Sequence, residues 1–73
     1  MAFEVILNRP GVYRILLEES QEGTYVNVFD SPESKGPYLD YLQDDLEMAK
    51  RACREMYGVA EREWRQVPDE HWH

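Results

Sequence analysis

Cys53 is the only cysteine in the sequence and its strongest nucleophile type. A reactive thiol needs partial exposure and a positive neighbour that stabilises the thiolate, and Lys50, Arg51 and Arg54 lie close to Cys53 along the chain. However, Cys53 follows Ala49 by four residues and falls within an apolar stripe of helical spacing. At such a position cysteine acts as a small hydrophobic side chain. We therefore expect Cys53 to belong to the core, and we keep a thiol-dependent enzyme or redox sensor as the rival hypothesis.

Two histidines near the carboxyl terminus, His71 and His73, stand beside Asp69 and Glu70 and could offer metal ligands. A metal site needs fixed ligand geometry and supporting hydrogen bonds around the ligands. A chain end is a poor place for both, so we expect no metal site and no cofactor.

Acidic side chains cluster at two places, Glu18 with Glu19 and Asp40 with Asp44 and Asp45. Paired carboxylates act as acid and base only where their surroundings drive the two pKa values apart. Adjacent strand residues point to opposite faces, so Glu18 and Glu19 should not converge. The sequence also lacks a Gly-rich phosphate loop and a nucleophile elbow. We expect a solvated acidic surface, no catalytic residue and no enzyme activity.

The chain of 73 residues carries a net charge of −7, from 15 acidic and 8 basic residues. The excess lies in residues 1–47, which hold ten acids and three bases. Such a surface repels nucleic acid and anionic lipid. The charge either serves solubility or attracts a basic protein partner. A chain this short also leaves little room for a deep metabolite cleft. We therefore expect a protein partner, with no nucleic acid, membrane or small-molecule substrate.

The amino terminus, MAFEVILNRPG, has no basic leader and only a short apolar run, so it does not match a signal peptide. A single cysteine cannot form an internal disulfide, and no apolar run reaches the roughly 20 residues of a membrane span. These features predict a cytoplasmic protein.

Three segments of the first half have strand character: residues 3–7 alternate apolar and polar positions, and residues 12–19 and 24–30 are rich in branched and aromatic side chains. The segments between them, 8–11 and 20–23, supply turn residues, including glycines that tolerate positive φ. Three strands joined by two short turns predict an antiparallel meander.

Residues 31–37 hold two prolines and a glycine and must form a loop. Residues 38–42 are ambiguous, because their leucines continue the helical spacing and a helix could begin near Asp40. The start signals lie later, since Asp44 followed by Glu47 matches a capping box in outline. We therefore favour an extended segment at 38–42, as a fourth strand.

From Asp45 the sequence predicts an amphipathic helix with an apolar stripe made of Leu46, Ala49, Cys53, Met56 and Tyr57. Gly58 should end this helix with a positive φ. We expect a short turn at 60–63 and a brief strand at 64–67. The predicted organisation is a single domain over residues 1–67 and a flexible tail over residues 68–73.

The pattern from Asp44 to Trp64 is similar to that of a set of small uncharacterised bacterial proteins. It consists of the acidic cap, Leu46-Glu47, Ala49, the Tyr57-Gly58-Val59 stop and the tryptophan five residues further on. In those proteins a strand-rich amino-terminal half precedes one amphipathic helix. The resemblance implies the same fold class and a bacterial origin, and it implies no activity.

Both faces of the predicted sheet carry large apolar groups, and one short helix can cover only one of them. We expect the smaller branched set to face the helix: Val12, Leu16, Val26 and Val28. Either the segments 38–42 and 59–67 wrap over the other face, or a partner covers it. For the second case we expect the other set to form a protein interface: Tyr13, Ile15, Leu17, Tyr25 and Phe29. Exposed apolar patches of a few hundred Å² mark interaction sites.

These expectations define an α+β fold with an antiparallel three- to four-stranded meander and one helix packed on it. The function that they favour is a small, acidic, non-catalytic protein-interaction module, either homodimeric or bound to another protein. The alternative is an immunity or antitoxin-type protein that neutralises a basic partner by charge complementarity.

Overall fold

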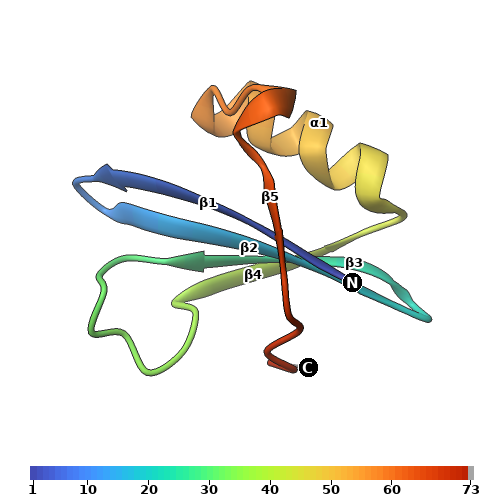
Figure 1. The fold of residues 1–73 in the computed structure, drawn as a ribbon, viewed down its shortest axis with the longest axis horizontal. Helices are drawn as coiled ribbons and strands as arrows, with labels where there is room; N and C mark the ends of the chain where they lie inside the picture. The colour runs from blue at the N-terminus through green and yellow to red at the C-terminus, as the bar shows by residue number, and fades with distance from the viewer. Residues whose placement is uncertain (73) are drawn as a thin grey trace.

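The computed structural model describes residues 1–72 and shows a five-stranded antiparallel sheet with one α-helix packed on one face (Figure 1). The strands lie in the order β4-β3-β2-β1-β5 across the sheet. The α+β class predicted from the sequence is confirmed. The elements are β1 (Ala2–Arg9), β2 (Val12–Ser20), β3 (Gly23–Phe29), β4 (Leu39–Gln43), α1 (Leu46–Tyr57), the 3₁₀ helix η1 (Glu61–Glu63) and β5 (Arg65–Val67).

The two predicted turns join β1 to β2 and β2 to β3, and both are tighter than the sequence suggested. β1 continues to Arg9, so only Pro10 and Gly11 separate it from β2. Gly11 has φ +82° and Gly23 has φ +145°, backbone conformations that other residues rarely adopt. The glycines therefore allow the chain to reverse direction within two residues.

Residues 38–42 are extended, as predicted, and most of them lie in the fourth strand, β4. The strand pairs antiparallel with β3, with Leu39 opposite Val28 and Leu42 opposite Tyr25. β4 therefore extends the sheet at its edge and does not wrap over either face.

Asp45 is the residue that caps α1, and its carboxylate accepts a hydrogen bond of 2.9 Å from the backbone N–H of Met48. The prediction of Asp44 as the cap was wrong by one residue, so Glu47 does not occupy the capping-box position. The predicted stop at Gly58 is confirmed, with φ +71°. Arg9 donates a 2.6 Å hydrogen bond to the carbonyl of Tyr57 and places a positive charge at the helix carboxyl end.

The pairing of β2 with β3 decides which side chains face the helix. Ile15 pairs with Val28 and Leu17 with Val26, and these four buried side chains pack with Ala49 and Cys53 of α1. The opposite face, called the open face below, carries Leu16 and Phe29. The predicted faces are therefore right for Val12, Val26 and Val28, which pack on the helix side. They are wrong for Leu16, Ile15 and Leu17 of β2, because the alternating sets of the two strands were joined in the wrong combination.

The segment after α1 follows the prediction closely. The 3₁₀ helix η1 occupies the place of the predicted turn, and β5 pairs antiparallel with β1, with Ala2 opposite Val67. Trp64 lies between η1 and β5 in the chain and is buried in the core on the helix face. The hydrogen bond from the N–H of Ala60 to the carboxylate of Glu63, 2.9 Å long, closes the 3₁₀ turn.

Candidate functional site

The five predicted interface residues do not form one exposed surface. Ile15 and Leu17 lie on the helix face and are fully buried. Tyr25 and Phe29 lie on the open face, where Tyr25 is half-buried and Phe29 is buried. Tyr13 is half-buried and packs with neither of the two core clusters. The set therefore offers no continuous patch to a partner.

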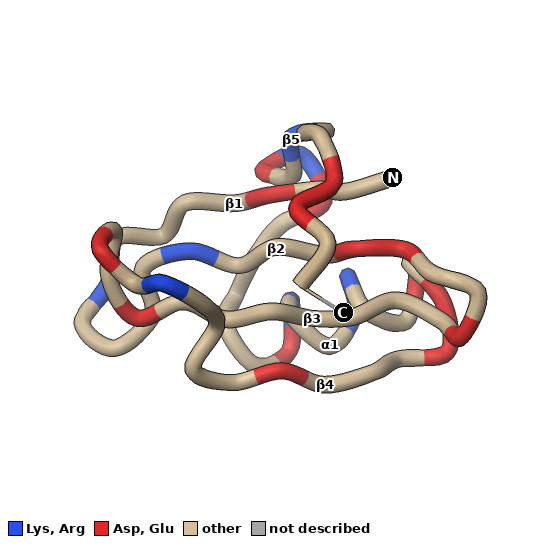
Figure 2. Tube along the Cα trace, turned by 90° about the horizontal axis from the view of Figure 1, so that it is seen from below, with Lys and Arg blue, Asp and Glu red and all other residues tan. Residues whose placement is uncertain are grey.

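The open face is covered in part by the end of the chain itself. In Figure 2 the chain after β5 runs across β1 and β2 toward β3, on the side of the sheet away from α1. Glu18 lies beneath this segment and is 6% exposed. Its carboxylate accepts three backbone hydrogen bonds, from the N–H groups of Glu70 (2.6 Å), His71 (2.8 Å) and Trp72 (3.3 Å).

Side chains add two further contacts between this segment and the sheet. Arg14 forms an ion pair with Glu70 and another, of 2.7 Å, with Glu4. The hydrogen bond from Arg14 lowers the pKa of the Glu70 carboxyl group. Trp72 packs edge-on against Phe29 with ring centroids 5.6 Å apart. These contacts differ from the loose tail predicted for residues 68–73, of which His73 lies outside the described residues.

The prediction that Glu18 lies on a solvated surface was wrong, because Glu18 is buried. Glu18 and Glu19 point to opposite faces, as predicted, since Glu18 pairs with Tyr25 and Glu19 with Thr24. A glutamate that directly follows the buried run of β2 is the signal that could have marked it. Its partners at the end of the chain are backbone N–H groups, which any sequence supplies, so the sequence does not identify them.

Replacing Glu18 by glutamine should release the segment Asp69–Trp72 from the sheet. Glutamine has one acceptor oxygen and turns an N–H₂ donor toward groups that are themselves donors. Hydrogen bonds to a charged group contribute about 1.5–3 kcal/mol each, so the docked population should fall strongly. The measurement is the ¹⁵N relaxation of the Trp72 backbone and indole. Glu19→Gln, an exposed neighbour, is the matched control, and equal effects of both changes would contradict the assignment.

Cys53 lies in the core of the helix face, as predicted, and is fully buried. Burial raises the pKa of its thiol to about 12. Lys50, a basic residue close to Cys53 in the sequence, forms a 2.7 Å ion pair with Glu61. The surroundings of Cys53 therefore oppose thiolate formation. Among the described residues no group of histidine, cysteine and acidic side chains could hold a metal ion.

The free edge of β4 carries the apolar surface that the sequence analysis did not single out. Tyr38, Leu39 and Leu42 are 52%, 38% and 47% exposed. Leu39 lies on the helix face and Leu42 on the open face, opposite Val28 and Tyr25 respectively. Apolar residues on both faces are also typical of a buried strand, so the sequence alone does not identify this edge.

Acidic residues flank this edge, and Figure 2 shows them along β4 and at its end. Asp40 lies within the strand, and Asp44 and Asp45 follow it at the start of α1. β4 is also held to the helix, because the hydroxyl groups of Tyr41 and Tyr57 are hydrogen-bonded at 2.9 Å. Burial and this hydrogen bond raise the pKa of Tyr57. The edge strand β4 thus carries both exposed leucines and acidic side chains, and its contact with α1 holds it in place.

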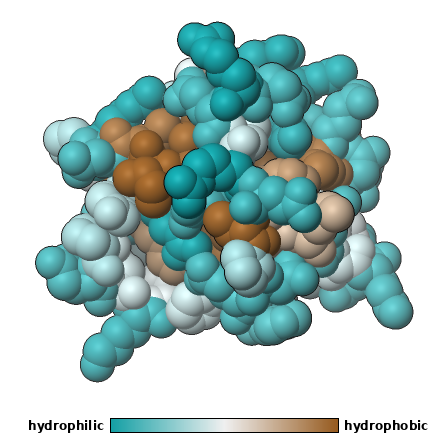
Figure 3. Space-filling model, in the orientation of Figure 1, coloured by the Kyte–Doolittle hydropathy of each residue, from teal (hydrophilic) through white to brown (hydrophobic). Residues whose placement is uncertain are grey.

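The face drawn in Figure 3, which includes β5, has a different character. Hydrophobic side chains gather there in separate areas, with hydrophilic side chains between them. Small separated areas are normal for a monomer surface. This face therefore offers less to a partner than the edge of β4.

The fold and the site together define an α+β protein with an antiparallel sheet, one covering helix and, at β4, an acidic edge strand. Comparison of the chain with protein-family models, with curated proteins and with solved structures gives no match. No helix among residues 1–72 has both the length and the apolar character to cross a membrane.

Proposed function

We propose that this protein is a small, non-catalytic interaction module of the cytoplasm that binds a basic, extended segment of a partner protein along the free edge of β4. The observation that carries the proposal is the exposed apolar edge of β4 with acids along it. Strand addition to a sheet edge combines main-chain hydrogen bonds, which give affinity, with side-chain contacts on alternate faces, which give specificity.

Of the usual protections of an edge strand, β4 carries one charged side chain, that of Asp40, but no lysine and no proline. Natural proteins place lysine, proline or a bulge on such edges to prevent unwanted pairing, whereas β4 has the sequence LDYLQ. Leu39 and Leu42 would contact an added strand from opposite faces of the sheet. The outer side of β4 pairs with none of the described strands, and its exposed leucines lie on both faces of the sheet. Both features support the pairing of β4 with a strand of a partner.

The charge of the edge supports a basic partner. Asp40, Asp44 and Asp45 would face lysine or arginine side chains of an added strand, and the net charge of −7 would attract a basic chain over a longer range. A second copy of this chain would instead bring two sets of these acids together. A basic toxin held by an immunity-type protein is one partner of this chemistry.

The test uses a short capped peptide that alternates lysine and valine, added to the ¹⁵N-labelled protein. We expect saturable amide shifts confined to β4 and its neighbours, with an affinity that falls as salt is raised, because salt screens the attraction. A peptide that alternates glutamate and valine should not bind.

Leu42→Lys should weaken peptide binding about tenfold, because burial of half a leucine side chain contributes about 1 kcal/mol and the added charge repels the peptide. Ile6→Lys is the matched control, since Ile6 is 48% exposed on the same face but lies on β1. Equal weakening by both substitutions would contradict the proposal. Self-association that strengthens with salt, detected by sedimentation, would indicate a second copy as the occupant instead.

A further inference from the structure

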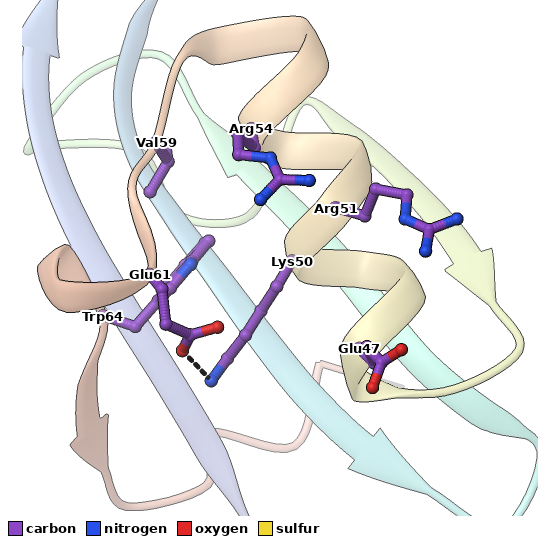
Figure 4. A pocket seen from close by; sticks show the side chains of 7 residues that line it. All are labelled: Glu47, Lys50, Arg51, Arg54, Val59, Glu61 and Trp64. Carbon is purple, nitrogen blue, oxygen red and sulfur yellow. Dashed lines mark hydrogen bonds and ion pairs between the residues drawn. The ribbon is translucent and has the colours of Figure 1, made fainter.

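A hollow of about 220 Å³ lies between α1 and the segment that holds η1, away from the edge of β4. Its lining carries three basic side chains, Lys50, Arg51 and Arg54, and two acidic ones, Glu47 and Glu61. The lining is therefore net positive in a protein that is net negative. Figure 4 shows Lys50 and Glu61 reaching toward each other across the hollow, with Arg51 turned away from the segment that carries Val59.

Trp64 and Arg54 both line this hollow, and Arg54 is exposed to solvent there. The indole N–H of Trp64 is buried, and it has no hydrogen-bond partner in the described part of the chain. Buried indole groups usually have one. Arg54 lies one helical turn after Lys50, and like charges at this spacing repel each other. Glu61 neutralises Lys50, whereas the guanidinium of Arg54 makes no ion pair within residues 1–72.

The rest of the lining decides what kind of acceptor fits. Val59 and the Trp64 ring are apolar, so a ligand with an apolar body gains contact there. Glu47 and Glu61 would repel a doubly charged phosphate more than a singly charged carboxylate. The volume is below the roughly 300–1,000 Å³ of pockets for complete drug-sized ligands. The hollow therefore suits a small group with one negative charge.

We propose that this hollow binds the carboxylate of a small organic acid or of a peptide terminus. The guanidinium of Arg54 holds the carboxylate, and the indole N–H of Trp64 donates to one of its oxygens. The apolar body of the ligand packs on Val59. Arginine suits this role, because its guanidinium group matches the two oxygens of a carboxylate. The site is separate from the β4 edge and does not depend on the function proposed above.

The experiment follows the two indole N–H signals of the ¹⁵N-labelled protein while butyrate is added at constant ionic strength. The signal of Trp64 should move and saturate. That of Trp72, whose N–H already donates to Glu70 at 2.9 Å, should stay in place as an internal control. Butyramide, the neutral analogue, and inorganic phosphate should both cause much smaller shifts. Acetylvaline distinguishes the two sources, because tighter binding than butyrate indicates a peptide terminus and weaker binding a free acid.

Arg54→Gln should weaken butyrate binding about tenfold or more, the effect of losing a charge-assisted hydrogen bond. Arg62→Gln removes the same charge from η1 at a residue that does not line the hollow, and it should leave the affinity unchanged. Equal losses in the two variants would overturn the proposal. Shifts of both indole signals without saturation, or phosphate binding as tight as that of butyrate, would also overturn it. Neither result would bear on peptide binding at β4.

Discussion

Replacing Gly23 by alanine should destabilise the protein by about 2–5 kcal/mol, the sum of a strained backbone and a steric clash. Gly23 has φ +145°, and a Cβ atom added there would lie 2.2 Å from the carbonyl oxygen of Gln43. The carbonyl belongs to the backbone, and the position of a Cβ atom is fixed by the backbone, so no rotation of a side chain relieves the clash. The start of β3 and the end of β4 would have to separate.

Gly11→Ala is the matched control for this prediction. Gly11 also has a positive φ, of +82°, but a Cβ atom there would meet no heavy atom within 4 Å. Only the cost of the backbone conformation, about 1 kcal/mol, applies there. Thermal unfolding followed by circular dichroism should show a melting temperature at least about 10 °C lower for Gly23→Ala than for wild type. Equal losses at the two positions would show that β4 does not approach Gly23 closely.

The elements of this fold follow from local signals that the sequence displays. The strand period of residues 3–7 and the apolar stripe from Leu46 each fix an element by themselves. Gly58 ends the helix because only a residue without a Cβ atom adopts φ +71° without strain. Such signals involve only a few neighbouring residues, so they predict these elements without information about the rest of the chain.

The faces of the sheet need one further fact, which is the register of β2 against β3. Alternation within a strand says which residues share a face, but it does not match that set to the neighbouring strand. A two-residue turn at Gln21 and Glu22 pairs Ser20 with Gly23 and therefore Ile15 with Val28. Reading the segment SQEG as a two-residue hairpin turn would have placed these side chains correctly.

The covering of the open face lay beyond local signals altogether. Glu18 and the backbone of residues 70–72 are more than fifty positions apart in the sequence, and backbone N–H groups are present at every non-proline residue. The exposed edge at Leu39 and Leu42 was hidden for a related reason, because their spacing also fits a helix. For Glu18 the tertiary arrangement decides between a solvated and a buried side chain, and for Leu39 and Leu42 it decides between a strand and a helix.

Cys53 should react with a thiol reagent at least about a thousandfold more slowly in the folded protein than in denaturant at the same pH. Burial raises the pKa of the thiol from 9.0 to about 12, so the thiolate fraction at neutral pH falls by about that factor. The buried sulfur also becomes accessible only when the helix face opens. A chromogenic disulfide reagent releases a coloured product as it reacts with the thiol. The absorbance of this product, followed in native buffer and in guanidinium chloride, gives the labelling rates of the folded and the unfolded protein. Fast labelling of the folded protein would restore the hypothesis of a thiol-dependent enzyme.

The same pKa shift predicts how stability depends on pH. The unfolded thiol loses its proton near pH 9, whereas the folded thiol keeps it up to about pH 12. The folded state therefore binds more protons over this range, and the free energy of unfolding decreases as the pH rises through it. Cys53→Ala should cost about 0.5–3 kcal/mol at neutral pH and should make the alkaline decrease shallower. The remaining decrease includes Tyr57, whose pKa is also raised by burial. An unchanged slope in Cys53→Ala would mean that the thiol is not buried in its neutral form, and the assignment of Cys53 to the core would then fail.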